Sequence, residues 1–404
     1  PLLIDRFPDH LKLIAQRDVA LGSFFLPFDA PLRRKCVHAV EDLAHLAGAD
    51  VLQWEDVPIN VDALPPNSSA RRTLPVVRMA LFKRPEGLSE DGWFACRYLL
   101  RLALDHQIST EVNDEFYVVS LSNRTLVYKG LAELSRIGEL YPDLQDPHVA
   151  SRFVLFHSRY CTNTTTAWRR AQPFWALAHN GEIATIKGNV AWMKAIGRDL
   201  IAQLRDKYPT LAPIADLAGD IVCSGGSDTA NLDDMVIALI AGGMSIPQSL
   251  LALLPESSKA VGDDARLGSF YEAMDVFLGA CDGPAAVVAC DGDEAVAHLD
   301  RNGLRPLWIT TTPDYAVAAS ELTGKFPTGD VETQRLLGPG DTVVVNLRTG
   351  EVRLNDAVHE DIARRAFPTP NGRIVRGQTG DVCDDAVELA QLQRSFGMTK
   401  EDLD

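Results

Sequence analysis

The stretch "FWALAHNGEI", residues 174–183, passes from an apolar, strand-like run directly into four residues that can donate, accept, turn and ionise. The apolar half is typical of a buried strand, and His179 to Glu182 follow it at once. Asn180 followed by Gly181 is the commonest pair in a two-residue hairpin turn. Taken alone the pair favours such a turn, but a side-chain amide beside an unobstructed backbone N–H can also stabilise an oxyanion.

Strand-like and helix-like segments alternate on both sides of this stretch, and strands often follow strands. Such an order is not a regular strand–helix–strand repeat, so it favours antiparallel sheets with helices packed outside them. Three polar turns, "SNR", "DGD" and "RTG", separate apolar arms and predict hairpins. The predicted strands cover residues 19–27, 73–82, 116–130, 153–160, 285–300 and 341–354.

Five further segments carry apolar residues at three- and four-residue spacing, the pattern of a helix with one buried face. A glycine at the end of three of them favours a helix end at that point. The predicted helices cover residues 31–48, 90–106, 188–208, 231–243 and 266–280.

The charge balance limits the partners that the chain can have. Its 404 residues include 39 Lys+Arg and 55 Asp+Glu, a formal net charge of -16, with no long basic run. We therefore predict no nucleic-acid partner, because a surface that follows a phosphate backbone needs clustered cations. No apolar stretch reaches the roughly 18 to 20 residues that cross a bilayer, so we expect no membrane partner and a cytoplasmic location.

Seven cysteines are scattered along the chain, and none forms a C-x-x-C pair. An odd, scattered set predicts neither a disulfide framework nor a zinc or iron–sulfur site. We therefore expect no metal in this chain, and we expect most of the thiols to be reduced and buried.

Three other segments place polar residues at a strand end or a helix start. Arg159 can hold a carboxylate with two parallel hydrogen bonds, or it can pair with one of the many acids. Asp228 can bind an ammonium group, although Ser227 or Asp228 can equally be the N-cap of the following helix. The three segments are "HSRYCTN" at 157–163, "CSGGSDTANLDD" at 223–234 and "LDRNGLRP" at 299–306.

The four polar segments are more informative together than singly. Residues 157–195, "HSRYCTNTTTAWRRAQPFWALAHNGEIATIKGNVAWMKA", resemble the active-site stretch of the type 2 glutamine amidotransferase domain that begins the glutamate synthase large subunit. The likeness extends to "YKGLAELSRIGELYPDLQD", "GGSDTANLDD", "DGPAAVVACDGDEAVAHLDRNGLRP", "AASELTG" and, at the end, "LQRSFGMTKEDLD". It covers nearly the whole chain.

This resemblance implies an α+β fold, a four-layer α/β/β/α sandwich of the N-terminal-nucleophile hydrolase type. It places the amidotransferase domain at residues 1–366 and a linker towards a central synthase domain at 367–404. The chain begins at Pro1 and has no "CGVGF"-like strand, so we expect the first strand of the fold and the nucleophilic Cys to be missing from it. We interpret the chain as an interior piece of a longer polypeptide.

The resemblance also implies a reaction. In this family an N-terminal Cys attacks the side-chain amide of glutamine, its own α-amino group acts as the base, and ammonia leaves for a synthase site. Carried over to this sequence, Asn180 and Gly181 form the oxyanion hole. Arg159 holds the α-carboxylate of glutamine and Asp228 its α-amine, with His179 as a further substrate-binding residue.

The implied function is hydrolysis of glutamine to glutamate and ammonia, which glutamate synthase transfers to 2-oxoglutarate. FMN, an iron–sulfur cluster, a reductase small subunit and the remaining large-subunit domains are implied for the parent enzyme, whereas this chain is expected to hold no cofactor and to be inactive alone. Two alternatives stay open. One is a nucleophile-free regulatory or scaffold homologue that binds glutamine or a partner subunit, and the other is a stand-alone amidotransferase that feeds another synthase.

Overall fold

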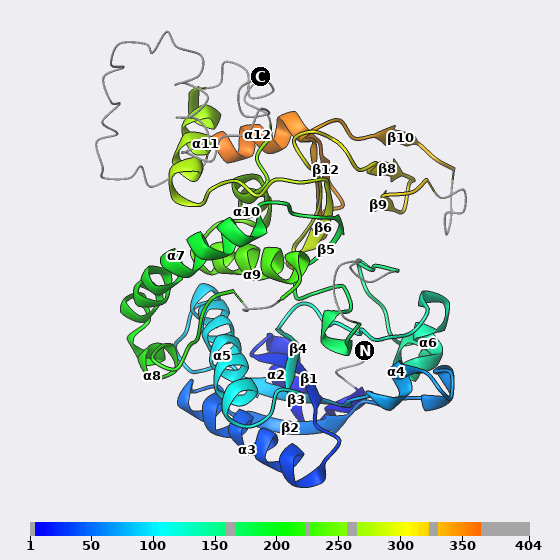
Figure 1. The fold of residues 1–404 in the computed structure, drawn as a ribbon, viewed down its shortest axis with the longest axis vertical. Coiled ribbons are helices and arrows are strands. Elements are labelled where there is room, and N and C mark those ends of the chain that lie inside the picture. Colours follow the sequence, from blue (N-terminus) through cyan, green and yellow to red (C-terminus); the bar gives the residue numbers. More distant parts are fainter. Residues whose placement is uncertain (1–4, 159–165, 223–225, 257–264, 323–329, 365–404) are drawn as a thin grey trace, which may run out of the picture. The chain divides into compact units, whose positions relative to one another are not determined.

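Two antiparallel sheets organise the chain in the computed structural model (Figure 1). The first sheet is built around β1, Val19–Leu26, because all eight of its residues are buried and neighbouring strands flank it on both sides. Its sequence "VALGSFFL" suits that central place, since β-branched and aromatic side chains fill both faces of a buried strand. The structure describes residues 5–158, 166–222, 226–256, 265–322 and 330–364.

The first sheet has the strand order β2-β3-β1-β4. Two long helices belong to this half: α5 packs on β4 and on α3, and α3 packs on β2. A buried cluster joins Leu21 and Met79 of the sheet to Tyr141 and Trp168 from later in the chain. The other elements of this half are β2 (Val51–Asp56), β3 (Val76–Lys83), β4 (Tyr117–Ser122), α3 (Ala30–Leu46) and α5 (Glu90–Glu111).

The second sheet has the order β12-β11-β7-β6-β5 and is antiparallel throughout. The predicted "DGD" turn joins β6 to β7, and the predicted "RTG" turn joins β11 to β12, so both hairpins are confirmed. The strands are β5 (Leu177–Gly181), β6 (Ala285–Cys290), β7 (Glu294–Leu299), β11 (Thr342–Asn346) and β12 (Val352–Arg353).

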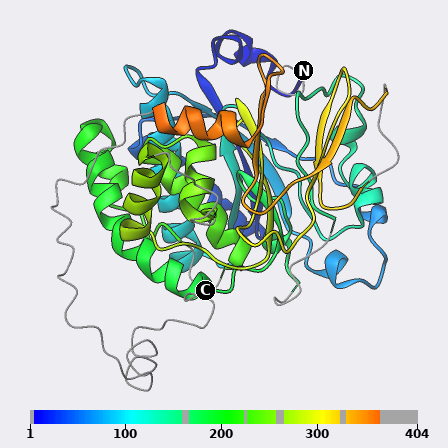
Figure 2. The ribbon, with the colours of Figure 1, turned by 90° about the horizontal axis from the view of Figure 1, so that it is seen from above.

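Helices cover this second sheet, and Figure 2 shows the green and orange helices gathered to one side of its strands. α9 packs on β5, α10 on β7 and α12 on β11. α9 also packs on α5 and so connects the two sheets. The helices are α7 (Ile186–Lys207), α9 (Asp228–Ala241), α10 (Ile246–Leu253), α11 (Ala265–Phe277) and α12 (Asn355–Arg364).

A small third sheet, of order β10-β8-β9, packs on the second one. Leu307 and Ile309 share a buried cluster with Ala286, Leu299 and Val343 of the larger sheet. Its strands are β8 (Trp308–Thr311), β9 (Ala316–Ala319) and β10 (Thr333–Leu336). The short helices are η1 (Pro8–His10), α2 (Leu11–Gln16), η2 (Val61–Ala63), α4 (Ser69–Arg72), η3 (Leu134–Arg136), α6 (Ile137–Leu140), η4 (Pro142–Gln145), η5 (Trp168–Arg170), η6 (Pro209–Leu211) and α8 (Ala212–Ala215).

The α+β class with antiparallel sheets is confirmed, whereas two predicted strands are wrong. The "SNR" turn follows β4, but residues 123–130 form no second arm. Residues 153–158, the described part of the predicted strand 153–160, are not a strand either. Val154 is 77% exposed and Phe156 60% exposed there. The apolar alternation is present, but a strand exists only where another strand accepts its hydrogen bonds.

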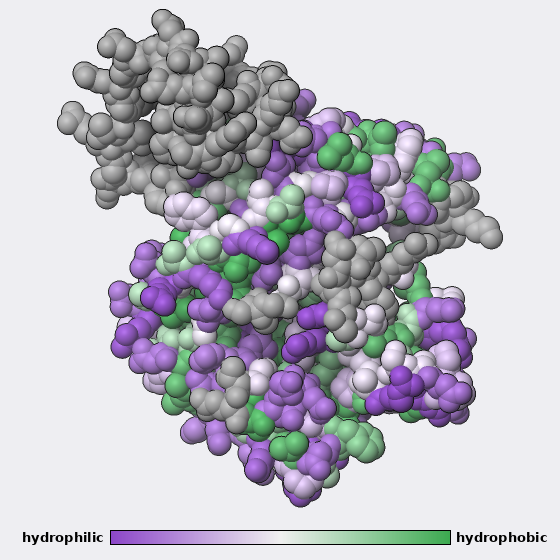
Figure 3. Space-filling view, in the orientation of Figure 1, coloured by the Kyte–Doolittle hydropathy of each residue, from purple (hydrophilic) through white to green (hydrophobic). Residues whose placement is uncertain are grey.

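The described residues all belong to one compact unit, Pro1–Ala366. The predicted linker, residues 367–404, lies outside the described part of the chain. On the face drawn in Figure 3, hydrophilic residues predominate and hydrophobic ones form small, separate patches. No helix in the described ranges is both long enough and apolar enough to cross a membrane.

His298, fully buried on β7, makes the stability of the fold depend on pH. Its Nε2 donates to the Leu254 carbonyl at 2.8 Å, and its Nδ1 accepts from the Thr342 hydroxyl at 2.8 Å. Burial lowers the pKa of His298 from its ordinary 6.5 to about 4. The unfolded chain therefore takes up a proton at a higher pH than the folded chain does, so acid favours unfolding.

We expect the free energy of unfolding to fall between pH 6.5 and pH 4, by ~3 kcal/mol more than in the H298Q variant. Urea unfolding of both proteins at several pH values measures this difference. Parallel pH profiles for the two proteins would contradict the prediction.

Candidate active site

The end of β5 presents backbone groups to the open edge of its sheet. β5 pairs with β6. Two hydrogen bonds show which backbone groups of this strand point towards β6: the Cys290 N–H donates to the Ala176 carbonyl, and the Glu182 N–H donates to the Pro284 carbonyl. Antiparallel ladders alternate, so His179 and Gly181 direct their backbone groups away from β6. The side chain of Gln172 confirms this at His179, because it accepts the N–H at 2.8 Å and donates to the carbonyl at 3.2 Å.

Asn180 lies in β5, half-buried, between these two residues. Its side-chain amide makes no hydrogen bond with any residue in the described ranges, whereas Gln172 nearby uses both ends of its own amide. The hairpin-turn interpretation of Asn180 and Gly181 is therefore wrong, because both residues belong to a paired strand. A second Asn-Gly pair, Asn302 and Gly303, does form a turn.

Helix α9 brings its first residues against the end of this strand. Ser227 is the N-cap, and its hydroxyl accepts the Ala230 N–H at 3.1 Å. Asp228 accepts the N–H of Ile183, two residues beyond β5, at 3.0 Å. The buried hydroxyl of Thr229 lies 3.2 Å from Nδ1 of His179. A carboxylate in the first turn is favoured by the helix dipole, so α9 stabilises the negative charge that it places here.

Gly181 is required by the backbone that packs against it. Its φ is +144°, and a Cβ at this position would lie 1.7 Å from the Pro284 carbonyl oxygen. Across the same contact, a Cβ on Gly283 would lie 2.1 Å from the Glu182 carbonyl oxygen. The two glycines allow the chain after β5 and the chain before β6 to touch, backbone to backbone.

The segment "LDRNGLRP" supports this contact from the side of β6. The buried Asp300 carboxylate accepts the Ala285 N–H at 3.0 Å and the Asn302 N–H at 3.0 Å. Arg301 forms a two-point ion pair with Asp282, in the chain before β6. The polar residues of this segment therefore hold Ala285, the strand partner of Gly181, in place.

His179 is neutral at pH 7. Burial lowers its pKa, the nearby Asp228 raises it, and His157 and Arg305 lower it again. Its side chain is only 2% exposed and braces β5 against α9 through Thr229. Asp228 and Arg305 come from different parts of the chain. Both act electrostatically on His179, so both lie close to the end of β5.

Of the five predicted site residues, His179, Asn180, Gly181 and Asp228 gather at this one place. Arg159 lies outside the described residues. The N-cap alternative holds for Ser227, which leaves Asp228 as the first residue of the helix. Sequence reasoning missed Gln172, and it missed Asp233, whose carboxylate lies buried under the start of β5. A signal for Asp233 exists, since adjacent acids stand inside the apolar run "NLDDMVIALIA".

A cavity of about 770 Å³ lies beside the start of β5. Phe174, Trp175 and Gln172 line it, together with Lys129, but Asn180, Gly181 and Asp228 do not. Burial lowers the pKa of Lys129 to about 7, and its ammonium donates to the Arg169 carbonyl at 2.9 Å. The cavity therefore adjoins the candidate site without containing it.

The cysteines of the described ranges do not suit an iron–sulfur cluster. Cys36, Cys96, Cys281 and Cys290 are free and buried, and burial raises the pKa of the last three thiols to about 12. A cluster needs several thiolates in one place, and these buried thiols do not supply them. Nothing in the described part of the chain points to a flavin site either.

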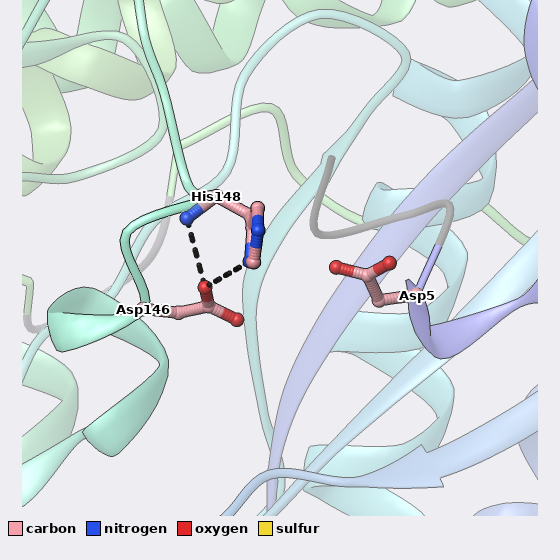
Figure 4. A group of neighbouring side chains, drawn as sticks. All are labelled: Asp5, Asp146 and His148. Carbon is pink, nitrogen blue, oxygen red and sulfur yellow. Dashed lines mark hydrogen bonds and ion pairs between the residues drawn. The ribbon is translucent and has the colours of Figure 1, made fainter.

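One group in the described ranges brings three potential metal ligands within 4.8 Å of one another: Asp5, Asp146 and His148 (Figure 4). All three are exposed, and Asp146 already accepts the backbone N–H of His148 at 2.8 Å. Exposed carboxylates commonly gather in this way without an ion, and we assign no metal to them.

The family described as Glutamine amidotransferases class-II matches residues 5–368, most of the chain. The chain belongs to this amidotransferase family. Its α+β architecture with antiparallel sheets agrees with the class that the sequence predicts. The NADPH glutamate synthase large chain of Azospirillum brasilense is 32% identical over 422 residues, covering 98% of this chain. Ferredoxin-dependent glutamate synthase 2 of Synechocystis is 32% identical over 403 residues, covering 96% of it.

The chain spans about a quarter of the length of these curated relatives, 27% and 25%. Among solved structures, the glutamine phosphoribosylpyrophosphate amidotransferase of B. subtilis aligns with 83% of this chain and 49% of its own. The identity is 14% and the TM-score 0.30, and at that score the alignment adds nothing to the family assignment.

We expect Gly181→Ala to destabilise this amidotransferase domain by about 2 to 4 kcal/mol, because the new Cβ meets the Pro284 carbonyl and the backbone conformation disfavours L residues. Gly188→Ala in α7 is the matched control, since nothing lies within 4 Å of its Cβ position. That variant should gain up to about 1 kcal/mol. Chemical unfolding of both variants measures the contrast, and equal effects would contradict the packing argument.

Proposed function

We propose that this chain is the glutaminase domain of a glutamate synthase, which hydrolyses glutamine to glutamate and ammonia for transfer to 2-oxoglutarate. The family and the relatives support the class of domain. The end of β5 supports the chemistry, because adjacent residues there present a half-buried side-chain amide that no described residue hydrogen-bonds and a backbone N–H that faces away from β6.

In this proposal the side-chain N–H of Asn180 and the backbone N–H of Gly181 donate to the oxygen that becomes negative when the amide carbon is attacked. Donors fixed on a paired strand need no reorganisation during the reaction. Such preorganisation is the main way in which an oxyanion hole lowers the activation free energy. The bonds of Gln172, Thr229 and Asp228 to β5 and its end hold that strand.

Asp228, His179 and Arg159 form the proposed group that recognises the amino-acid end of glutamine. Asp228 accepts the Ile183 N–H on Oδ2 and the Thr229 N–H on Oδ1. A carboxylate fixed in this way suits an α-ammonium, because it carries the opposite charge and accepts hydrogen bonds. His179 is neutral and braces the strand, so it does not repel that ammonium. Arg159 follows the described residue Ser158, and Ser158 and His157 belong to the wall of the adjoining cavity.

The attacking group in this proposal is the N-terminal Cys that the family resemblance implies, whose own α-amine takes the thiol proton. The experiments use the longest natural polypeptide that contains this sequence. FMN, the iron–sulfur cluster, the reductase subunit and the cytoplasmic location stay predictions for that polypeptide.

A nucleophile-free regulatory or scaffold homologue is the second candidate, favoured by the buried thiols of Cys96, Cys281 and Cys290. Burial raises the pKa of each to about 12, so none of these three supplies a reactive thiolate at pH 7. The two candidate functions differ in the role of the Asn180 side-chain amide, which is catalytic only in the glutaminase. A scaffold needs no catalytic donor at this position, whereas an oxyanion donor must be left without a hydrogen-bond partner, as the Asn180 side chain is among the described residues.

We expect Asn180→Ala to lower glutamine turnover by about a hundredfold to a thousandfold while leaving glutamine binding nearly unchanged, because the bond forms only during attack. Asn302→Ala is the matched control, since Asn302 also precedes a glycine but lies in an exposed turn. Steady-state hydrolysis and equilibrium binding are measured separately. Normal turnover per folded molecule in N180A would remove Asn180 from the oxyanion site. A wild-type polypeptide that binds glutamine without hydrolysing it would favour the scaffold candidate.

We expect Arg159→Ala to raise the Michaelis constant for glutamine about tenfold or more, because one charge-assisted bond is worth roughly 1.5 to 3 kcal/mol. Turnover at saturating glutamine should change less. An unchanged Michaelis constant would remove Arg159 from the site.

A further inference from the structure

The Asp233 carboxylate accepts hydrogen bonds from three consecutive backbone N–H groups at the start of β5. Its Oδ1 accepts from Ala176 at 2.7 Å and from Leu177 at 3.0 Å, and its Oδ2 accepts from Trp175 at 3.1 Å. The side chain is 1% exposed, so water does not compete for these bonds. Leu177 is the first residue of the strand, and Asn180 stands three residues further along it, about 10 Å away.

The same helix therefore holds both ends of the strand. Asp228, at the first position of α9, takes the Ile183 N–H beyond the end of β5. Asp233, five residues later, takes the N–H groups at its start. Between these two points, Thr229 meets His179. The strand that carries Asn180 and Gly181 is fixed to α9 at three places along its length.

A carboxylate suits this position better than any neutral side chain of the same size. Three N–H groups need an acceptor with several lone pairs and a negative charge, and an Asn amide would turn an NH2 donor towards them. Arg101, whose guanidinium lies 2.8 Å from the neighbouring Asp234, favours the ionised form of Asp233. Burial raises the pKa of Asp233 to about 6, while the three N–H donors favour its ionised form.

We propose that Asp233 is a positioning residue for glutamine hydrolysis, which fixes the start of β5 so that Asn180 and Gly181 meet the developing oxyanion at the correct distance. This inference rests on the proposed function. Asp233 touches no substrate in this scheme and acts through the backbone of residues 175–177. A displacement of about 1 Å at a reacting centre can cost about a hundredfold in rate, so the strand needs such a fixed start.

The test compares D233N with D234N in the longest natural polypeptide. Both variants remove one buried carboxylate from the same helix and the same charge cluster, but Asp234 pairs with Arg101 instead of the start of β5. We expect D233N to lower kcat for glutamine hydrolysis about a hundredfold with KM little changed, and D234N to keep kcat per folded molecule. Hydrogen exchange of the amides in 174–183 should be faster in D233N alone.

Equal kcat values for the two variants, corrected for the folded fraction, would overturn the proposal. If D233N does not fold, Asp233→Glu takes its place in the test, since this change keeps the charge and moves the carboxylate by one methylene. A kcat of this variant equal to that of the wild type would then overturn the proposal. If the wild-type polypeptide hydrolyses no glutamine, the proposed function itself fails. The exchange measurement then decides separately whether Asp233 holds the strand.

Discussion

Two adjacent carboxylates in the middle of α9 connect the parts of this domain. Asp233 holds the start of β5 in the second sheet, and Asp234 forms a buried ion pair with Arg101 of α5, which packs on the first sheet. Arg101 also lies over the ring of Trp175, at 4.8 Å from its centre. A buried charge is costly unless it has partners. Any packing of α9 that left one of these carboxylates or the guanidinium unpaired would therefore be unfavourable, which favours the observed packing over the alternatives.

The fold could be predicted from the sequence wherever local chemistry decides it. β1 is apolar on both faces and flanked by turn residues, and the "DGD" and "RTG" hairpins carry their own turn signals. The two failures, the arm after "SNR" and the strand at 153–158, have the alternation of a strand but find no partner strand among the described residues. Pairing is a property of the whole fold, which a local pattern cannot supply.

The site could be predicted only in part, and for a different reason. The polar segments identified the residues that gather at the end of β5. They could not predict in which direction a backbone N–H points, because that depends on the register of β5 with β6. Gln172 and Asp233 act on the backbone of β5 from 7 and 57 residues away in sequence, so no spacing could relate them to it. The adjacent acids in an apolar helix were the one visible sign, because a buried charge always needs an explanation.

Asn180 and Gly181 are neighbours in sequence, yet they differ in what they can tell about function. Gly181 is explained by packing alone, since any side chain there would strike the Pro284 carbonyl whether or not the domain catalyses anything. Its presence is therefore weak support for an oxyanion site. The half-buried Asn180 amide has no such explanation: no described residue bonds it, and the strand would pair as well with another side chain at that position. A half-buried polar group that no described residue hydrogen-bonds is the feature of this site that calls for a ligand.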